Sequence, residues 1–298
     1  EKDLDKWLKI LNEQSTIAVD TETSSLNTLE ADLVGISFSY AANKACYIPL
    51  SHKSIKSIKK EIVLKKIKPI LEDPSIKKVG QNIKFDFIVL QQQGIEINSI
   101  EDTMLISYTL DAGTNRHNLD TLAEIHLNHK TISYKELVGS GKNKLNFSDI
   151  TLDKATEYAA EDADITLRLY NHLKKRLDYE KLNKVYEIFE KPMVKLLSKI
   201  EFNGIKVDNI YLKKLSKKFE DKLKKIEKEI YLIANKEFNI GSPKQLGEII
   251  YNELKIAKLK KTRKGSLATN ANVLEDLALK GHNFPKFVLQ WRQISKLK

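Results

Sequence analysis

The chain has 298 residues, of which 41% are hydrophobic and 31% are charged. This length is enough for two domains, or one large domain, with a buried core, and the composition is ordinary for a soluble globular protein. No segment approaches the roughly 18 uninterrupted apolar residues of a membrane span, and the single cysteine, Cys46, excludes an internal disulfide and fits the reducing cytoplasm.

The net charge of +11 is unevenly distributed along the chain. Residues 1–180 carry 24 Lys and Arg against 27 Asp and Glu, whereas residues 181–298 carry 27 against 13. This difference suggests two domains with different roles, and basic surfaces attract polyanions, of which nucleic acid is the commonest. Lysines that keep long helices soluble would give the same charge, so charge alone decides nothing.

The N-terminal segment EKDLDKWLKI has no basic-then-apolar signal sequence, and no initiator Met. We therefore expect a cytoplasmic fragment or processed product. The first strand is predicted at Thr16–Val19, a short β-branched run that ends at Asp20. Strand-like runs at Leu33–Tyr40 and Ala45–Leu50 flank a link of hairpin length, so three antiparallel strands are expected.

Helical periodicity then alternates with a short strand. The predicted order is βββαβα followed by further helices, which favours an α/β domain with a mixed sheet of the ribonuclease-H-like kind. The segments are a helix at Ser57–Leu71, a strand at Lys77–Val79, a helix at Ile83–Gln93 closed by Gly94, and helices at Thr103–Leu110, Leu119–Leu127 and Leu152–Leu173.

Beyond Tyr179 the strand signal disappears and the chain is predicted to be helical and basic. Two long amphipathic helices, at 182–201 and 209–234, are separated by a turn at Asn203-Gly204. Ser242 is a candidate N-cap for a helix that begins at Pro243. The segment AKLKKTRKGSLATN, residues 257–270, is predicted to be a loop, and two short helices follow at Ala271–Leu279 and Phe284–Lys296.

Three short clusters combine carboxylates with other polar groups. They are Asp20-Thr21-Glu22, Gln81 to Asp86, and Tyr158 to Asp162. Residues i and i+2 of a strand project to one face, and so do residues i and i+4 of a helix, which applies to the pairs Asn82–Asp86 and Tyr158–Asp162. Converging carboxylates repel one another unless cations hold them, and hard oxygen ligands suit Mg²⁺ or Mn²⁺.

Two such ions would activate water for phosphodiester hydrolysis, and a tyrosine hydroxyl beside them could orient that water. Each cluster alone has a commoner explanation. An acidic residue at a strand end is usually a cap or a solvated loop residue, a helical Asp usually lies on a solvated face, and Tyr158 would pass for a core aromatic. Only their occurrence together, in this order, favours a nuclease.

The segments AVDTETSSL, VGQNIKFD and YAAEDADIT resemble the three exonuclease motifs of the tyrosine-bearing branch of the DEDD superfamily. They are most similar to the proofreading domain of bacterial family A DNA polymerases, the DNA polymerase I type. The similarity continues through DTMLISYTLDAGTNRHNLDTLAEIHLNHKTISYKELVGSGKNKLNF. Beyond residue 179, EKPMVKLLSKIEFNGIKVD and WRQISKLK look like the beginning of the polymerase domain, up to its thumb.

This resemblance implies a 3'-5' exonuclease domain at residues 1–178 and the N-terminal, helical part of a polymerase domain at residues 179–298. It implies that two divalent ions, Mg²⁺ or Mn²⁺, bind Asp20, Glu22, Asp86 and Asp162, with Asp20 between them and Tyr158 positioning the attacking water. It also implies a set of residues that contact the terminal nucleotides: Leu26, Gln81, Asn82, Phe85, Arg116 and Phe147.

Two of these residues, Leu26 and Phe147, could equally be ordinary core residues. Phe85 departs from the family pattern, because close relatives often have Tyr there, and this implies the loss of a hydroxyl contact near the substrate. The palm and fingers of the polymerase are not part of the sequence, so we expect this piece not to synthesise DNA.

The function expected is therefore the removal of mismatched nucleotides from DNA 3' ends, within a DNA polymerase I of replication and repair. A single-stranded 3' end would occupy the exonuclease site and duplex DNA would lie along the basic helices of a monomer, with no membrane partner. Two alternatives stay open: an RNA-processing exonuclease of the ribonuclease D type, and a non-catalytic DNA-binding module with structural carboxylates.

Overall fold

The computed structural model describes residues 1–53, 57–141, 144–258, 265 and 267–298. These residues form two compact units, Glu1–Gly204 and Ile205–Lys298. The first unit contains the sheet and its covering helices, and the second contains helices only among its described residues.

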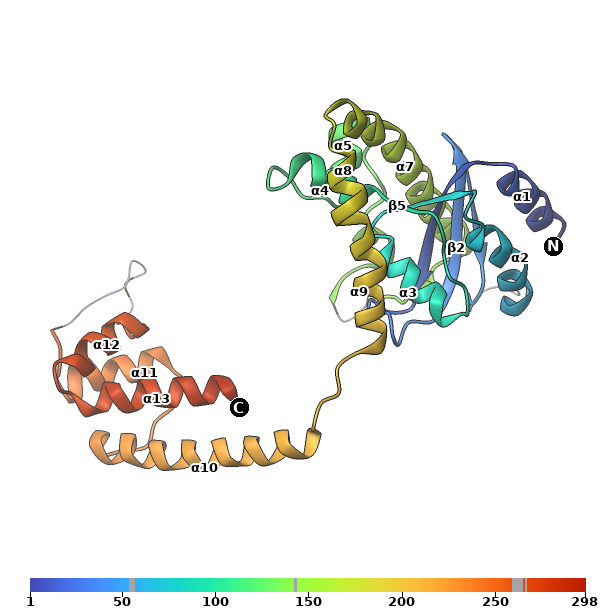
Figure 1. Ribbon diagram of the computed structural model, residues 1–298. Helices are drawn as coiled ribbons and strands as arrows, with labels where there is room; N and C mark the ends of the chain where they lie inside the picture. The colour runs from blue at the N-terminus through green and yellow to red at the C-terminus, as the bar shows by residue number, and fades with distance from the viewer. Residues whose placement is uncertain (54–56, 142–143, 259–264, 266) are drawn as a thin grey trace. The chain divides into compact units, whose positions relative to one another are not determined.

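A mixed sheet forms the centre of the first unit, as the sequence predicts, with five strands where four were expected (Figure 1). The strand order is β3-β2-β1-β4-β5; β1 pairs with β2 and β2 with β3 in antiparallel fashion, whereas β4 is parallel to β1 and β5 is parallel to β4. The strands are β1 (Thr16–Thr23), β2 (Leu33–Ala41), β3 (Lys44–Pro49), β4 (Lys77–Gly80) and β5 (Ile100–Asp102).

The central strand β1 contributes to the core on both faces of the sheet. Ile17 and Val19 pack in one hydrophobic cluster, together with side chains from the helices that cover that face, whereas Ala18 packs in another cluster on the opposite face. Because successive strand residues alternate between faces, this pattern fixes the direction of the side chains that follow in β1 as far as Glu22, where the register with β2 shifts.

Counted over the residues that the structure describes, seven α-helices of the first unit surround the sheet before residue 180. On one face lie α1 and α2, and α3 contributes to the same core, whereas α7 lies on the other face with α4 and α5 (Figure 1). Their bounds are α1 (Lys2–Asn12), α2 (Lys60–Glu72), α3 (Lys84–Gln92), α4 (Thr103–Asp111), α5 (Leu119–Leu127), α6 (Tyr134–Val138) and α7 (Leu152–Tyr179).

The ribonuclease-H-like sheet and its main helices are thus found where the sequence predicts them. The elements of this part of the chain that are absent from the prediction are α1, α6, β5 and a short 3-10 helix at Phe147–Asp149. Helix α1 buries only Leu4 and Leu11, and the three residues of β5 are too few to establish an alternating pattern.

The segment predicted as one helix at 182–201 is divided in the structure. A short helix α8 (Asn183–Val185) continues into a π-helical turn, η3 (Tyr186–Glu190), and then into α9 (Lys191–Asn203). Pro192 stands at the start of α9. Proline has no N–H for the carbonyl of the preceding turn, so a local change of hydrogen-bonding pattern at this point relieves the conflict. Val194 of α9 packs into the core of the sheet.

The second unit is a small helical domain with its own core. It consists of α10 (Asn209–Ala234), α11 (Pro243–Glu248), the π turn η4 (Ile249–Glu253), α12 (Ala271–Leu279) and α13 (Asn283–Leu297). The predicted N-cap is confirmed, since Ser242 Oγ accepts the N–H of Gln245 at 3.4 Å. Of the loop predicted at 257–270, residues 259–264 and 266 lie outside the described residues.

The net positive charge of the protein comes from this second unit. Residues 205–298 carry 22 Lys and Arg against 10 Asp and Glu, whereas residues 1–204 carry 29 against 30. Among the described residues, none of the helices combines the length and the apolar content that crossing a bilayer requires.

Candidate active site

Two carboxylates project from the end of β1 toward α7. Asp20 and Glu22 follow Ala18 at intervals of two residues, so they share its face of the sheet. That face is covered by α7, whose side chains surround Ala18. Glu22 lies directly opposite Gly35 of β2 and is 7% exposed. The alternation of β1 therefore carries both carboxylates toward the same helix.

Helix α7 approaches the sheet closely because its inner face is lined with alanines. Ala155, Ala159 and Ala163 recur every four residues and are completely buried. Small side chains at this spacing allow the helix to lie against the sheet without a thick layer of side chains between them. Tyr158 and Asp162, each one residue before a buried alanine, thereby reach the end of β1, where they line a common pocket with Asp20.

Three of these carboxylates form a group that could hold a cation. One ligand oxygen from each of Asp20, Glu22 and Asp162 lies within 4.8 Å of the other two. Glu22 Oε1 is buried and has no hydrogen-bond partner, although buried acceptors normally have one. A set of hard carboxylate oxygens with an unsatisfied member fits a divalent cation such as Mg²⁺ or Mn²⁺.

The fourth carboxylate, Asp86, enters from α3 along the free edge of β1. Strand β4 pairs with β1 only from Thr16 to Ala18, which leaves the next part of that edge open. Asp86 Oδ1 accepts hydrogen bonds there from the backbone N–H of Thr21 at 2.8 Å and from its hydroxyl at 2.5 Å. Asp86 is 2% exposed, so its carboxylate is buried at the edge of β1, beside Thr21.

Burial and neighbouring charges raise the pKa of all four carboxyl groups. Burial, followed by the neighbouring charge of Asp162, raises the pKa of Asp20 well above its usual value. Burial, followed by the charge of Asp20, does the same for the pKa of Glu22 and that of Asp86. Burial raises the pKa of Asp162 to about 7, against the opposing effect of the Tyr158 hydroxyl. Such mutual repulsion is what a bound cation would relieve.

Tyr158 belongs to an aromatic wall beside the carboxylates. Its ring lies 6.0 Å from that of Tyr134 and 6.1 Å from that of Phe147, centroid to centroid. Burial, and then the charge of Asp162, raises the pKa of the Tyr158 hydroxyl above its usual range. The hydroxyl therefore stays protonated at neutral pH and is able to donate a hydrogen bond.

Three of the carboxylates, Asp20, Glu22 and Asp162, and the aromatic wall line a pocket of about 510 Å³, and Asp86 lies outside this lining. Residues 20–26 form the strand side of the pocket and residues 144–147 form a loop side opposite. This volume is within the range of small-molecule sites and can admit a mononucleotide. The remaining lining residues are Phe85, Tyr134, Tyr158 and Asp162.

The residues expected to contact the substrate occupy different positions. Leu26 is 86% exposed at the rim of the pocket, whereas Phe147 is 1% exposed at its wall, and Phe85 also lines it. The other three residues expected to contact the substrate, Gln81, Asn82 and Arg116, lie outside the lining of this pocket. Gln81 donates to the His117 carbonyl at 2.7 Å and accepts from the Thr103 hydroxyl at 2.5 Å.

Asn82 and Arg116 are both exposed. Asn82 does not share a helical face with Asp86, because α3 begins at Lys84 and Asn82 has a left-handed backbone with φ of 60°. The i, i+4 geometry predicted for this pair is therefore wrong, whereas that of Tyr158 and Asp162 on α7 is confirmed.

Sequence reasoning missed two side chains of the pocket, Tyr134 and Lys144. The Lys144 ammonium lies 5.3 Å from the centre of the Tyr134 ring, a cation–π distance. Tyr134 begins the five-residue helix α6 and Lys144 lies in the segment after it, and no spacing rule connects them to the three motifs. The aromatic and basic side chains in the segment between motifs two and three were the one available signal.

A second missed feature lies behind Glu22. Gly35, opposite Glu22, has no room for a side chain, because a Cβ there would lie 2.0 Å from the Tyr47 hydroxyl. That hydroxyl is 2.7 Å from His52 Nε2. The glycine in the strand-like run LVGISFSY marked this close approach, since an isolated strand glycine often does.

Comparisons with known proteins agree with this architecture. The sequence model of the 3'-5' exonuclease family matches residues 1–178, and that of DNA polymerase family A matches residues 209–298. DNA polymerase I of Rhizobium leguminosarum is 43% identical over 99% of this chain and 31% of its own length. That of Pseudomonas aeruginosa is 41% identical over 99% and 33%.

Among solved structures, the POL domain of Pol1 from M. smegmatis, in complex with DNA primer-template and dNTP, has a TM-score of 0.76 at 25% identity. The match covers 99% of this chain and 47% of that one. The chain spans about a third of the length of the curated relatives named above. It belongs to the 3'-5' exonuclease family found in bacterial DNA polymerase I, and it continues into the start of a family A DNA polymerase domain.

Proposed function

We propose that the first unit hydrolyses the terminal phosphodiester of DNA 3' ends, with two divalent cations, and releases deoxynucleoside monophosphates. The observation that supports this most directly is the convergence of Asp20, Glu22 and Asp162 within 4.8 Å of one another. The pocket around them is large enough for one terminal nucleotide. Within a longer polymerase, this activity would remove mismatched nucleotides.

In this proposal the carboxylates of Asp20, Glu22, Asp86 and Asp162 hold the cations. Divalent cations would supply a lowered water pKa and charge stabilisation for the displaced oxygen, and Mg²⁺ or Mn²⁺ suits these ligands. Tyr158 orients the attacking water through its hydroxyl, which is protonated at neutral pH. The water oxygen forms the new bond to phosphorus, and the 3' oxygen of the preceding nucleotide leaves.

The apolar side chains of the pocket give the terminal bases a surface to stack on. Leu26 projects from the rim with 86% of its surface exposed, and Phe85 also lines the pocket, whereas the buried Phe147 supports the wall from behind. Stacking on such side chains is largely independent of base identity, as removal of any mismatched nucleotide requires. The site takes unpaired ends in preference to paired ones, because a paired base must first separate from its partner.

The test is an assay with single-stranded DNA labelled at its 5' end, incubated with Mg²⁺ or Mn²⁺, with and without a chelator. Stepwise shortening from the 3' end that requires the metal is expected. RNA of the same sequence is the comparison substrate, and preferential degradation of RNA would favour the ribonuclease D alternative. Metal-independent binding without cleavage would instead favour a non-catalytic DNA-binding module.

Replacing Tyr158 with Phe is expected to lower the hydrolysis rate about 10- to 100-fold, in the range of a lost positioning hydrogen bond, about 1.4–2.8 kcal/mol of activation free energy. The phenyl ring preserves the contacts with Tyr134 and Phe147, so stability and DNA affinity should change little. Single-turnover kinetics measure the hydrolysis rate separately from DNA binding. Tyr179→Phe, at an 87% exposed tyrosine at the end of the same helix, is the control.

The second unit, in this proposal, binds the phosphates of duplex DNA. Its support is the excess of 22 Lys and Arg over 10 Asp and Glu and the exposed lysines along α10. Phosphate contacts release counterions, so affinity depends on salt and not on sequence. The exonuclease domain would span residues 1–178 and the polymerase part residues 179–298 of a cytoplasmic monomer.

Changing Lys214, Lys218 and Lys225 of α10 together to Gln should therefore reduce the salt dependence of duplex binding. The slope of log affinity against log salt is expected to become shallower by about 0.9 for each lost phosphate contact. This slope is measured by fluorescence anisotropy with a labelled duplex at a series of salt concentrations from low to moderate. Three exposed lysines of α1, Lys2, Lys6 and Lys9, provide the matched triple variant. An equal effect of both variants would contradict a specific role for α10.

A further inference from the structure

The carboxylate of Asp102, at the end of β5, connects two helix starts. It is 1% exposed and accepts four backbone N–H groups. Those of Met104 and Leu105, at 2.9 and 3.3 Å, belong to the first turn of α4, so Asp102 is the N-cap of that helix. The other two are those of Asn82 at 3.1 Å and Ile83 at 3.0 Å, which precede α3.

The turn held by Asp102 determines how α3 enters the site. Asn82 has a φ of 60°, a left-handed conformation that is unfavourable for residues other than glycine. Its carbonyl accepts the N–H of Phe85 at 3.0 Å, and that of Ile83 accepts the N–H of Phe87 at 2.8 Å. Asp86 lies within this first turn. A carboxylate on two successive N–H groups compensates the strain and fixes where the turn begins.

Asp102 is itself held by Tyr186 of the π turn η3. The Tyr186 hydroxyl accepts the backbone N–H of Asp102 at 2.9 Å, and the tyrosine is completely buried. The ammonium groups of Lys174 and Lys191 each lie 5.7 Å from the centre of its ring. The π turn therefore places the buried Tyr186 against the end of β5.

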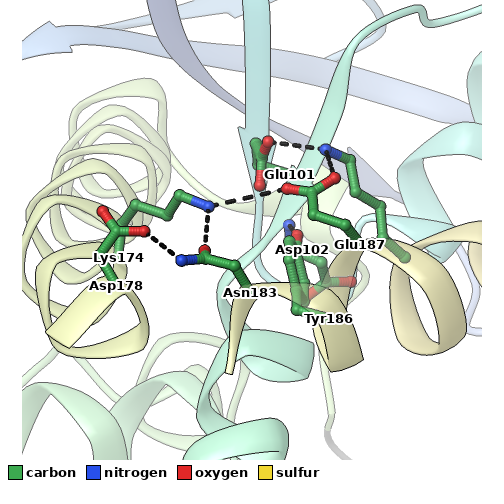
Figure 2. A network of polar contacts seen from close by, with 8 residues as sticks. Glu101, Asp102, Lys174, Asp178, Asn183, Tyr186 and Glu187 are labelled. Atoms are coloured by element: carbon green, nitrogen blue, oxygen red, sulfur yellow. Dashed lines mark hydrogen bonds and ion pairs between the residues drawn. The ribbon is translucent and has the colours of Figure 1, made fainter. Parts of the chain in front are cut away.

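A polar network around Tyr186 fixes that tyrosine in turn (Figure 2). Lys191 bridges Glu101 at 2.8 Å and Glu187 at 2.9 Å, and Glu101 is the residue before Asp102. On the side of α7, Lys174 donates to Asn183 at 3.0 Å. Figure 2 shows Glu101 and Asp102 at the end of β5, Lys174 on α7 and Asn183 on α8 close to Tyr186 and Glu187 of the π turn.

We propose that Asp102, supported by Tyr186, is a positioning residue for the metal carboxylate Asp86. It fixes the turn at Asn82-Ile83 so that α3 carries Asp86 to the open edge of β1, beside Asp20 and Glu22. This inference rests on the proposed function, since it assigns a role within that site. Asp102 lies outside the lining of the pocket and acts on Asp86 through the backbone of Asn82 and Ile83, which precede α3.

Asp102→Asn tests the proposal with little change in shape. Its amide oxygen can still cap α4, because one oxygen of Asp102 accepts from Asn82, Met104 and Leu105. The amide NH₂ then faces the N–H of Ile83 and cannot accept it. In the metal-free variant, hydrogen exchange at residues 82–86 should accelerate about tenfold, with exchange in the first turn of α4 unchanged.

The same variant should need a higher metal concentration. A lost supporting contact of this kind lowers metal affinity about 10- to 100-fold, so calorimetric titration with Mn²⁺ should give a dissociation constant raised at least tenfold. The rate at saturating metal should recover to near the wild-type value. A merely structural role would lower thermal stability without this recovery. Tyr186→Phe should shift both readouts in the same direction by a smaller factor, and it replaces Asp102→Asn if that variant does not fold.

The matched control is Asp208→Asn, at the N-cap of α10 in the other unit, where one carboxylate oxygen accepts the N–H groups of Ile210 and Tyr211. It removes the same charge from a helix start and should leave exchange at residues 82–86 and Mn²⁺ affinity unchanged. Wild-type exchange and Mn²⁺ affinity in Asp102→Asn would overturn the proposal. Absence of nuclease activity in the unmodified protein would instead overturn the proposed function, and the exchange result would still stand.

Discussion

Asp20→Asn is expected to abolish 3'-terminal hydrolysis, with a loss of about 1000-fold or more, equivalent to about 4 kcal/mol of activation free energy. Asp20 is the carboxylate whose charge acts on both Glu22 and Asp86, and its own pKa responds to Asp162. Its removal therefore affects the whole group of ligands. Because Asn has the same shape, the fold should be retained, which circular dichroism can verify.

The measurement is the single-turnover rate on single-stranded DNA at saturating Mn²⁺, so that weaker metal binding is separated from lost chemistry. Asp153→Asn is the matched control, because this exposed residue lies in the first turn of α7 and outside the pocket. The control should retain full activity. If Asp20→Asn kept more than a tenth of the wild-type rate, the carboxylate group could not be the centre of the reaction.

Parts of this site were predictable from the sequence because they follow from strict periodicities. The face shared by Asp20 and Glu22 depends only on the two-residue repeat of a strand, and that shared by Tyr158 and Asp162 only on the helical repeat. Both relations hold in the structure, since the strand continues to Thr23 and α7 contains both later residues. Local geometry that is independent of tertiary contacts can be derived from spacing.

The position of Asp86 could not be derived in the same way. Its motif begins in a left-handed turn at Asn82 and becomes helical only at Lys84. The conformation of that turn is stabilised by Asp102, a residue twenty positions later on a three-residue strand. The occurrence of the three clusters together, and then the resemblance to the exonuclease family, connected Asp86 with the other carboxylates, but the spacing of its own motif did not place it. Tertiary contacts of this kind override what the local spacing suggests.

In the helices after residue 180, tertiary contacts again override the structure that local periodicity suggests. Amphipathic periodicity predicts one continuous helix at 182–201, yet the structure inserts a π turn at Tyr186–Glu190. The turn follows from Pro192 and from the buried contacts of Tyr186 with the end of β5. The π-helical segment is only five residues long, which is too short for its own periodicity to stand out from that of the helices on either side. Figure 1 shows α9 continuing along the first unit beyond this turn.

The carboxylate group should also destabilise the metal-free protein at neutral pH. Burial raises the pKa of Asp162 to about 7, whereas its ordinary value is 3.8. Above pH 7 the carboxylate is charged in both the folded and the unfolded state, so the full cost is present. As the pH falls toward 4, the folded state binds a proton that the unfolded state does not, and the free energy of unfolding increases.

The size of this effect follows from the shift in pKa. At 1.36 kcal/mol per pKa unit, and reduced for the partial exposure of Asp162, the penalty is about 2–4 kcal/mol. Asp162→Asn removes it, so the melting temperature of the metal-free first unit at pH 7.5 should rise by roughly 5–10 °C. The difference between variant and wild type should disappear near pH 4, since the wild-type carboxyl is then protonated in the folded state.

The two units can melt separately, so the measurement must follow the first unit alone. Of the two tryptophans, Trp7 lies in α1, 5.5 Å from the ring of Tyr40, and Trp291 lies in the second unit. In a Trp291→Phe background, the fluorescence of Trp7 reports on the first unit. Mn²⁺ should raise the melting temperature of the parent protein strongly and that of Asp162→Asn much less, because a ligand that binds only the folded state stabilises it. A lower melting temperature for Asp162→Asn in the absence of metal would show that this carboxylate is instead a structural contact.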